Sequence, residues 1–589
     1  MKKLHRAAAA AMATVLSLSL LAACGSGDAT EEASSSSAES VSSAETPSQA
    51  EVAPPDTGAL DEATLAELGL EFVDDKYRFT ETRDITVEIF DRGLDGGKTA
   101  PEDNVWTDWI KEGMLRDHNV NVTYVPVPRW TEADDVNNLL ASGSAPDVCV
   151  TYNYAAIQQY ANMGGVTDLA EYVDKYAALI PALWDLLGTT NMYYDKDPVT
   201  GQLWALEAFL SDNGRINTFV RKDWLEKLGL ELPTTLEEFE AVLIAFRDNA
   251  ETLLGADASQ IIPFGLSFDV GWRAYNLLGS SIPDDITDKE LYIYGFDDRH
   301  FSKPWVKESV KILNRWYNEG LIWKDFPLYG EGDTTEDNLI KSGYVGSLEH
   351  QHNQPYRDGE NGWSYNLHNV VGEEADYIAV EPFLNDAGVP KKYIAGTVDR
   401  KVFFPATNDE PIASLLYLNW ITDLENRLYL QVGEEGRNHE VAADGAIQML
   451  TATDEYIQNS LNNIDYTITI NGVQFDGDPD KTYATRALSF PGVDPALIAR
   501  TYEVNFNYGF VAPTFHFSEI KSEEGMNTPL KEKRDALFAQ AITCTPDQFD
   551  TVWDSGYQDY LNSGMQAIID ERTQAWEARY GDAVDLPEE

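Results

Sequence analysis

The sequence predicts an α/β fold in which a parallel sheet is covered by helices. Two observations predict it. From residue 80 onward, segments with an apolar residue at every second position alternate with segments of helical periodicity. The chain also contains 14 Trp, 29 Tyr and 23 Phe among its 589 residues, which is enough for a large hydrophobic core.

Five consecutive segments carry this alternation. Asp84–Phe90 alternates apolar and polar residues and is expected to be the first strand, with Val120–Val127 the second. Val105–Arg116 has apolar residues at helical spacing, and Asp134–Ala141 is expected to be a short helix. Asp147–Val150 begins a third strand. This order is typical of parallel sheets, which bind ligands beyond the carboxyl ends of their strands.

The N-terminus has the pattern of a secretion signal. Three basic residues precede an apolar stretch that is too short and too rich in Ala for a membrane span. The stretch ends at Leu21-Ala22-Ala23-Cys24-Gly25, which resembles a bacterial lipobox, where the peptide is cut before the Cys and the thiol receives a lipid. We expect residues 1–23 to be a lipoprotein signal peptide and Cys24 to be the lipid attachment site. An ordinary secretory peptide with a chance cysteine is the alternative.

Residues 24–65 are expected to form a disordered tether. They are rich in Ser, Ala, Glu and Pro, and such a segment cannot bury enough apolar surface to fold. Together with the lipid, the tether would hold the body at the extracellular face of the cell membrane without spanning it.

The chain is strongly acidic, with a net charge of −56. A field of this sign repels phosphate backbones, so we expect no nucleic-acid partner. It also disfavours a polyanionic ligand unless a local basic pocket overrides it. The remaining cysteines are Cys149 and Cys544, and both a disulfide between them and two free thiols are open alternatives.

Four sequence blocks resemble one known family. In the first, Leu139–Val148, a helix end and a small-residue turn lead through Pro-Asp into an apolar strand. The second, Phe219–Phe239, closes a strand and begins two short helices; the others are Leu418–Gly436 and Gly564–Glu571. Together they resemble the bacterial extracellular solute-binding proteins of the sugar class (family 1), to which maltose-binding protein and its larger lipid-anchored relatives belong.

Local signals in the second block can be interpreted independently of the resemblance. Lys222–Leu228 is expected to be a short helix that Gly229 stops. Thr234 or Thr235 is expected to cap the next helix, with a Glu three residues further along completing a capping box.

The resemblance implies a periplasmic-binding-protein-like fold: two α/β lobes, each with a mainly parallel sheet flanked by helices, joined by a multi-strand hinge. It places the first lobe in residues 80–208 plus 398–450 and the second in residues 209–397 plus 500–589. The chain is expected to cross between lobes near Trp204–Ser211 and again near Ala395–Phe404.

A sugar receptor needs planar aromatic rings to stack on sugar faces and polar groups to bind hydroxyls. The candidates lie at predicted strand ends, at the first crossing and in loops where the resemblance places a ligand. They are Trp106, Asp108, Tyr152, Tyr154, Trp204, Glu207, Trp272, Arg273, Glu349, His350 and Gln351. For any single aromatic residue among them, core packing is the default interpretation.

No metal or other cofactor is predicted. His350 and His352 beside Glu349 make a thin metal cluster. Asp-rich turns at Asp195, Asp197 and Gly201, and at Asp476, Asp478 and Asp480, lack the spacing of an EF-hand. A structural calcium ion, which some relatives carry, stays open for one such turn.

The expected function is that of a monomeric, lipid-anchored solute-binding protein of an ABC importer. It would capture a carbohydrate, an oligosaccharide by preference, and deliver it to permease subunits. A secreted glycosidase or lyase is the rival, although the chain lacks the Gly-x-Ser-x-Gly elbow, the zinc-binding helix motif and the phosphate loop of common enzyme classes. A receptor for a peptide or another small solute is the second alternative.

Overall fold

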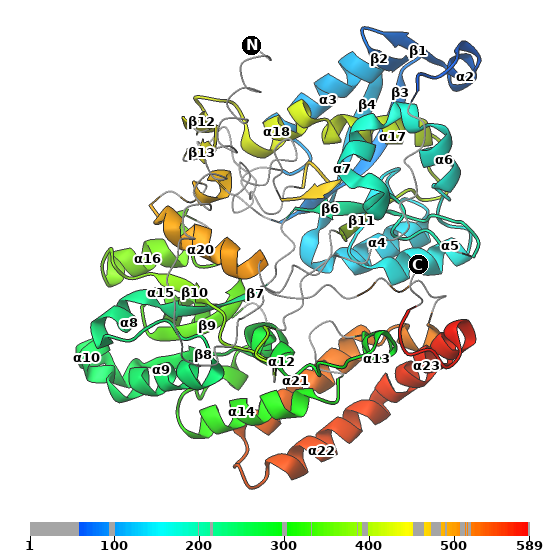
Figure 1. Cartoon of the computed structure of the whole chain (residues 1–589). Coiled ribbons are helices and arrows are strands. Elements are labelled where there is room, and N and C mark those ends of the chain that lie inside the picture. The colour runs from blue at the N-terminus through cyan, green and yellow to red at the C-terminus, as the bar shows by residue number, and fades with distance from the viewer. Residues whose placement is uncertain are drawn as a thin grey trace, which may run out of the picture. The chain divides into compact units, whose positions relative to one another are not determined.

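Figure 1 shows a computed structural model of the chain. It describes residues 58–92, 100–197, 199–211, 216–296, 303–330, 333–357, 359–385, 387–390, 398–443, 445–450, 465–472, 484–488, 490, 492–506, 513, 515 and 520–586. The predicted signal peptide, Cys24, most of the predicted tether and the turn at Asp476, Asp478 and Asp480 lie outside the described residues.

The first sheet follows the alternation that the sequence predicts. Its strands lie in the order β4 (Val120–Pro128), β3 (Arg83–Asp91), β5 (Cys149–Thr151), β11 (Val398–Phe403), β6 (Leu206–Leu210) and β14 (Ile470–Asn471). β3 joins β5 through a parallel bridge between Val87 and Val148. The first two predicted strands are confirmed, and so are the helix between them, α3 (Val105–His118), and the helix after the second, α4 (Glu132–Ser142).

The second sheet has the order β8 (Ile262–Gly265), β9 (Val345–Gln351), β7 (Ile216–Arg221) and β10 (Tyr377–Val380). In each sheet, all strands run the same way except one. The exceptions are β11, antiparallel to β5 and β6, and β7, antiparallel to β9 and β10. Each exception is the first strand that the chain forms after leaving the other sheet, so it enters against the direction of its neighbours.

The chain passes between the sheets slightly later than the sequence predicts. β6 continues to Leu210, and β7 begins at Ile216. Trp204 and Glu207, which we expected at the crossing, therefore belong to the first sheet and the segment before it. The return passage lies between the end of β10 and the start of β11.

Each sheet with its helices forms one lobe. The first sheet is covered by α3, α4, α5 (Tyr154–Asn162), α6 (Ala170–Lys175), α7 (Pro181–Met192), α17 (Pro411–Thr422) and α18 (Leu424–Val432). The second is covered by α8 (Lys222–Leu228), α9 (Leu236–Asp248), α10 (Ala250–Leu254), α11 (Val270–Arg273), α12 (Tyr275–Ser280), α14 (Val306–Asn318), α15 (Thr335–Lys341), α16 (Trp363–Val370) and α20 (Pro495–Phe506), with α21 (Asn527–Thr543), α22 (Phe549–Tyr560) and α23 (Gln566–Tyr580). α13 (Asp288–Ile293) packs on α23, and β12 (His439–Val441) pairs with β13 (Ile447–Met449).

The helix signals of the second block are confirmed. α8 ends where Gly229 adopts a left-handed conformation, with φ of 66°. Thr235 caps α9 by accepting a hydrogen bond from the backbone N–H of Glu238. The Glu238 carboxylate binds the backbone N–H of Thr234 rather than that of the cap, so the box closes one residue earlier than expected.

A small N-terminal unit adds to the first lobe before residue 80. α2 (Glu62–Leu68) begins inside the segment predicted as tether because the Asp61 carboxylate caps it. The hairpin β1 (Leu70–Val73) and β2 (Lys76–Phe79) follows. Leu70 and Phe79 are buried in the first-lobe core, so the folded body begins earlier than the sequence predicts.

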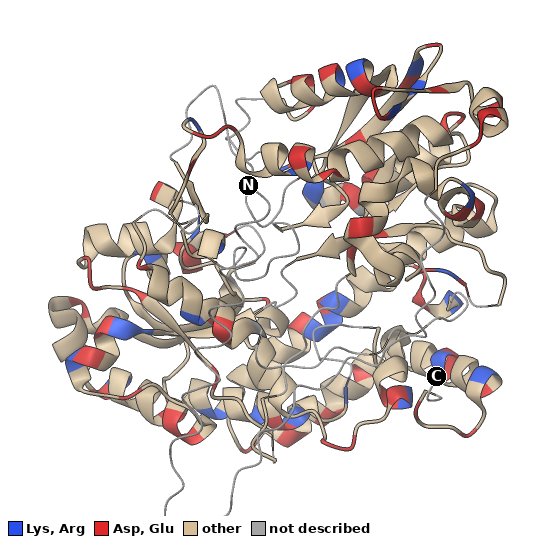
Figure 2. Cartoon of the chain, turned by 45° about the horizontal axis from the view of Figure 1, so that its top comes forward, with Lys and Arg blue, Asp and Glu red and all other residues tan. Residues whose placement is uncertain are grey.

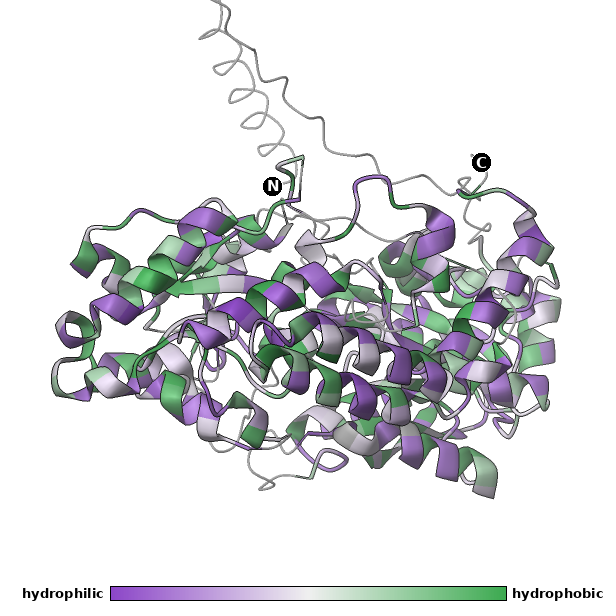
Figure 3. Ribbon diagram, turned by 90° about the horizontal axis from the view of Figure 1, so that it is seen from below, coloured by the Kyte–Doolittle hydropathy of each residue, from purple (hydrophilic) through white to green (hydrophobic). Residues whose placement is uncertain are grey.

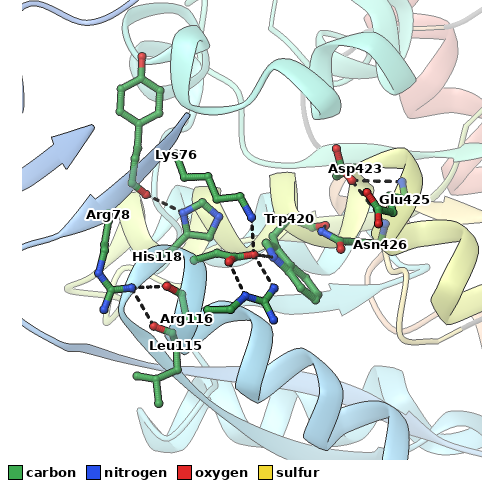
Figure 4. A network of polar contacts seen from close by, with 11 residues as sticks. Lys76, Arg78, Leu115, Arg116, His118, Trp420, Asp423, Glu425 and Asn426 are labelled. Atoms are coloured by element: carbon green, nitrogen blue, oxygen red, sulfur yellow. Dashed lines mark hydrogen bonds and ion pairs between the residues drawn. The ribbon is translucent and has the colours of Figure 1, made fainter. Parts of the chain in front are cut away.

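Polar contacts fasten this hairpin to the end of α3 (Figure 4). Asp117 accepts hydrogen bonds from Arg116 and from the Trp420 indole of α17, and Lys76 lies 2.7 Å away. Next to it, the His118 ring N–H donates to the Tyr77 carbonyl over 2.6 Å. The hairpin, α3 and α17 are thereby joined around one carboxylate.

Acidic residues lie on helices throughout the described chain (Figure 2), and polar and apolar residues alternate along the helices (Figure 3). No helix among the described residues is both long and apolar enough to cross a membrane. Cys149 and Cys544 are both free thiols, which decides between the two open alternatives for them.

Candidate functional site

The carboxyl ends of the parallel strands in both sheets point toward the crossing. β6 runs into the first passage at its carboxyl end, and β7 leaves that passage at its amino end beside the carboxyl end of β9. Residues that follow β3, β4 and β5 in the first lobe, and β9 in the second, therefore lie at the two sheet edges where a ligand would bind.

An aromatic pair stands at the first edge. Phe90, near the end of β3, stacks on Tyr152, which follows β5, with ring centres 6.1 Å apart and planes 15° from parallel. Arg129, directly after β4, places its guanidinium carbon 4.1 Å from the Tyr152 ring centre and 5.3 Å from that of Phe90. A ring surface and a fork of N–H donors thus come from three neighbouring strand ends.

Two buried carboxylates hold the end of β5 away from β3. After the bridge at Val148, the Glu88 carboxylate accepts the backbone N–H of Val150 over 2.9 Å, and Glu132 accepts that of Tyr152 over 3.2 Å. These side chains replace the carbonyls that a continued ladder would supply. Burial raises the pKa of Glu88 well above its usual range, and the charge of Glu132 adds to the effect. These two hydrogen bonds fix the end of β5 and thereby the position of Tyr152.

Asp465 binds two arginines, Arg92 and Arg400, at the same edge. Arg92 makes two hydrogen bonds to Asp465, of 2.6 and 3.1 Å, and Arg400 of β11 makes a third of 3.1 Å. Arg400 also donates to the carbonyl of Ile470, at the edge strand β14. Burial, and then the charge of Asp399, raise the pKa of the Tyr152 phenol, which is therefore a neutral hydroxyl.

A second charged group lies inside the first lobe. Glu207 of β6 is fully buried, and Lys401 of the paired strand β11 lies 3.2 Å from it. Burial raises the pKa of both Glu207 and Asp195, whereas these two carboxylates outweigh burial and raise that of Lys401. The Tyr154 hydroxyl donates to the Asp195 carbonyl over 3.3 Å. Glu207 is committed to the ion pair with Lys401, and its role here is to join β6 to β11.

The Asp-rich turn that follows α7 is closed by one of its own side chains. Asp197 accepts the backbone N–H groups of Val199 and Thr200 and thereby closes the turn itself. Within the described part of the chain, no three His, Cys, Asp or Glu side chains are grouped so that they could hold a metal ion.

The predicted residues on β9 reach the second edge. Glu349 is buried and accepts the backbone N–H groups of Asn276 and Leu277, so it anchors α12. His350 packs edge-on against Trp363 with ring centres 5.3 Å apart. Burial, followed by the charges of Arg273 and Arg357, holds the pKa of His350 well below its usual value. A neutral imidazole therefore stands beside two arginines.

Arginines bind the neighbours of His350. Arg357 donates to the Gln351 side-chain oxygen over 2.9 Å. Arg273 donates to Glu336 over 2.9 and 3.2 Å, and Trp272 packs edge-on against Tyr275 with ring centres 6.4 Å apart. Trp272, Arg273, Glu349, His350 and Gln351 therefore gather around α11, α12 and the end of β9.

Three predicted residues lie elsewhere. Trp106 is buried in the first core, edge-on against Tyr429 of α18 at 5.6 Å, so its indole is committed to packing. Asp108 is exposed on α3 beside Lys111, at 3.5 Å. Trp204 packs against the cluster beneath α4 and α5. Trp106 is therefore committed to the core, whereas Trp204 is only partly buried.

Sequence reasoning missed Phe90, Arg92 and Arg129 at the first edge. The signal that selected Tyr152, a position at a carboxyl strand end, applies equally to them. Asn353 and Asn505 in the second lobe had no such signal because they lie in a turn and in a helix that we did not predict.

A model of the bacterial extracellular solute-binding protein family matches residues 109–427. The polygalacturonan/rhamnogalacturonan-binding protein YtcQ of Bacillus subtilis (strain 168) is 24% identical over 280 residues, 43% of this chain and 52% of that protein. Lipoprotein LipO of the same organism is 23% identical over 351 residues, 56% of this chain and 63% of that protein. The matches thus span between half and two thirds of these relatives.

Among solved structures, the Streptococcus pneumoniae ABC-transporter substrate-binding protein FusA, an EF-hand mutant in complex with fructo-nystose, superposes with a TM-score of 0.57. It is 15% identical, and the superposition covers 85% of this chain and all of that chain. At this identity the likeness concerns the fold, and it confirms the predicted two-lobed class.

Proposed function

Because this chain belongs to the bacterial extracellular solute-binding proteins, as its sequence blocks implied, we propose that it captures a carbohydrate for an ABC importer. The ligand would bind between the two sheet edges and bridge the lobes. Ligand contacts on both edges favour the closed arrangement by their differential affinity for it, and permease subunits would receive that form. ATP hydrolysis would belong to other subunits.

The observation that carries the proposal is the group formed by Phe90, Tyr152 and Arg129. A sugar ring has an apolar face that packs on an aromatic side chain and hydroxyls around its rim that accept hydrogen bonds. Tyr152 supplies the ring surface and a neutral hydroxyl, and Arg129 supplies planar N–H donors at the ring. Both stand where parallel strands end, which is where ligands bind in such sheets.

The names of two similar proteins support carbohydrate as the solute class. YtcQ is named for polygalacturonan and rhamnogalacturonan, and FusA was solved with fructo-nystose. One of these ligands is acidic and the other neutral, so the relatives support the class without choosing a sugar. We propose a binding role without catalysis, in a monomer.

The test is calorimetric titration of the Cys24→Ser chain, which retains every described residue, with fructo-nystose, oligogalacturonides and rhamnogalacturonan fragments. Binding of at least one glycan with 1:1 stoichiometry and no product by chromatography is expected. Product from any glycan would transfer the protein to the glycosidase or lyase class. Binding of a tripeptide mixture with no glycan bound would establish the peptide alternative instead.

The lipid anchor is the second part of the proposal. It rests on Leu21–Gly25, which has the lipobox pattern, and on similarity to a protein named as a lipoprotein. The unaltered chain is expected to sediment with membranes of the bacterium that expresses it, and Cys24→Ser to appear in the medium. If Cys24→Ser still sediments with membranes, the anchor is not a lipid on Cys24.

A further inference from the structure

Two asparagines in the second lobe have buried side-chain amides without hydrogen-bond partners among the described residues. Asn353 and Asn505 have no exposed surface, and within the described part of the chain neither the nitrogen nor the oxygen of either side chain has a hydrogen-bond partner. The side-chain oxygen of nearby Gln354 is also buried without a partner. Buried amides are almost always paired, because leaving one unpaired costs free energy, so this group needs a physical explanation.

The two asparagines belong to segments that touch. Asn353 lies in the turn after β9, where His352 packs on Tyr502 of α20 with ring centres 5.3 Å apart. Asn505 is one helical turn beyond Tyr502 and therefore lies on the same side of α20, which faces this turn. The Asn217 side chain at the start of β7 donates to the Thr501 carbonyl over 2.9 Å and fixes the helix there.

One arginine connects this group to the crossing. Arg486 places its guanidinium 5.3 Å from the Tyr502 ring centre and donates to the Ser211 hydroxyl over 2.8 Å. Ser211 directly follows β6, at the carboxyl edge of the first sheet. The unpaired amides therefore lie beside the passage between the lobes, at the edge where the solute of the proposed function would bind.

The chemistry of the group indicates what it binds. A carboxamide offers both donors and an acceptor, and a sugar hydroxyl does the same, so each can satisfy the other without a charge. A carboxylate offers only acceptors, so it would leave the three unpaired amide oxygens without a donor. Several hydroxyls on adjacent carbons of one sugar can together supply the hydrogen-bond partners that the three amides lack.

We propose that Asn353, Gln354 and Asn505 form a subsite for the hydroxyl groups of an uncharged portion of the carbohydrate. The proposal rests on the proposed function, which supplies the solute class. It predicts that these unpaired amides destabilise the ligand-free protein, because the sugar supplies their hydrogen-bond partners. A site that only holds permanent structural water is the competing explanation.

The test combines affinity with thermal stability in Asn353→Ala, Asn505→Ala and Asn505→Leu, each in the Cys24→Ser chain. Leu keeps the number and branching of the side-chain heavy atoms while removing the hydrogen-bonding groups. Each variant is titrated with fructo-nystose and oligogalacturonides and melted without sugar. We expect the Kd of the sugar bound by the parent to rise about 10-fold or more, because a hydroxyl loses its partner. Asn505→Leu should melt at or above the parent temperature.

Asn314→Ala is the matched control. Asn314 is equally buried, but its side chain donates to the carbonyls of Ala541, Ile542 and Cys544. This variant should melt at a lower temperature and keep the parent Kd. The opposite pattern in Asn505→Leu, a clear fall in melting temperature with an unchanged Kd, would establish the structural-water explanation and overturn the subsite. If the parent itself binds no glycan, the proposed function fails and the subsite with it.

Discussion

The guanidinium carbon of Arg129 lies 4.1 Å from the centre of the Tyr152 ring, at the carboxyl edge of the first sheet. We predict that Arg129→Ala raises the Kd for the bound sugar about 10-fold, since it removes both a cation over the ring and a planar set of donors. The Kd of Arg129→Lys should lie between those of the parent and Arg129→Ala, because a Lys keeps the charge but not the planar set of donors. Calorimetry measures both.

Arg247→Ala provides the control for this series. Arg247 pairs with Asp248 on α9, in the second lobe and away from both sheet edges, and its removal should leave the Kd unchanged. An equal loss in Arg129→Ala and Arg247→Ala would mean that net charge alone, rather than the ring and guanidinium geometry, determines affinity.

Glu88→Gln is predicted to stabilise the protein at neutral pH. Burial holds the native pKa of Glu88 well above its ordinary value of 4.5, so above pH 4.5 the native state binds more protons than the unfolded one. Stability is therefore lost as the pH rises, at about 1.4 kcal/mol for each pH unit up to the native pKa. Gln keeps an acceptor for the Val150 N–H and avoids this loss.

Urea unfolding at pH 5 and pH 7 measures the effect. The gain in unfolding free energy should be small at pH 5 and larger at pH 7. Glu112→Gln, on the exposed side of α3, should change it by less than about 0.5 kcal/mol at either pH. A gain that is the same at both pH values would show that Glu88 is not protonated on folding.

Much of the first lobe could be predicted from the sequence because its signals are local. The two-residue alternation of β3 and β4 and the left-handed Gly229 depend on neighbouring residues only. The buried face of α3 could be predicted in part. Its residues at helical spacing do pack on the first core, with Ile110 and Met114 fully buried, but the helix also buries Trp106, which meets Tyr429 more than 300 residues away in the chain.

The site residues likewise divide into those that local sequence signals predict and those that depend on contacts far along the chain. Tyr152 could be found because a strand end is visible in the sequence, and the edge location of β9 residues followed from the resemblance. Glu207 was misplaced because the end of β6 is set by pairing with β11, almost 200 residues later. Asn505 could not be found, since its lack of partners exists only once α20 packs beside the turn at Asn353.

Asp117 is predicted to stabilise the N-terminal hairpin through its charge. Burial opposes its ionised form, but hydrogen bonds from Arg116, Lys76 and Trp420 outweigh it and hold the pKa of Asp117 far below its ordinary value of 3.8. Asp117→Asn should lower the unfolding free energy by about 1–2 kcal/mol at pH 7, a modest loss because both cations are partly exposed.

The pH dependence separates this charge effect from a packing effect. A native pKa below the unfolded one gives stability that is complete above pH 3.8 and is lost as the pH falls below it. The difference between the parent and Asp117→Asn, measured by urea unfolding, should therefore be constant from pH 5 to 7 and shrink below pH 4. A difference that persists undiminished at pH 3 would point to packing against Trp420 instead.

Lys401 connects the two strands that border the crossing, and its removal should be the costliest change. Lys401→Met leaves the Glu207 and Asp195 carboxylates buried without their cation, and breaking such a buried group costs about 3–5 kcal/mol. Because the native pKa of each carboxyl is raised, the native variant takes up protons as the pH falls toward 4.5. The loss measured by urea unfolding should therefore be greatest at pH 8 and smaller at pH 5.

A double variant tests whether the lower stability of Lys401→Met comes from the buried carboxylates that have lost their cation. Glu207→Gln added to Lys401→Met removes one buried negative charge, so the double variant should be more stable than Lys401→Met alone at pH 8. If it is instead less stable by the sum of the two single losses, the side chains act independently and no buried ion pair joins β6 to β11. Retention of glycan binding in the double variant, despite reduced stability, is expected because neither group contacts the solute directly.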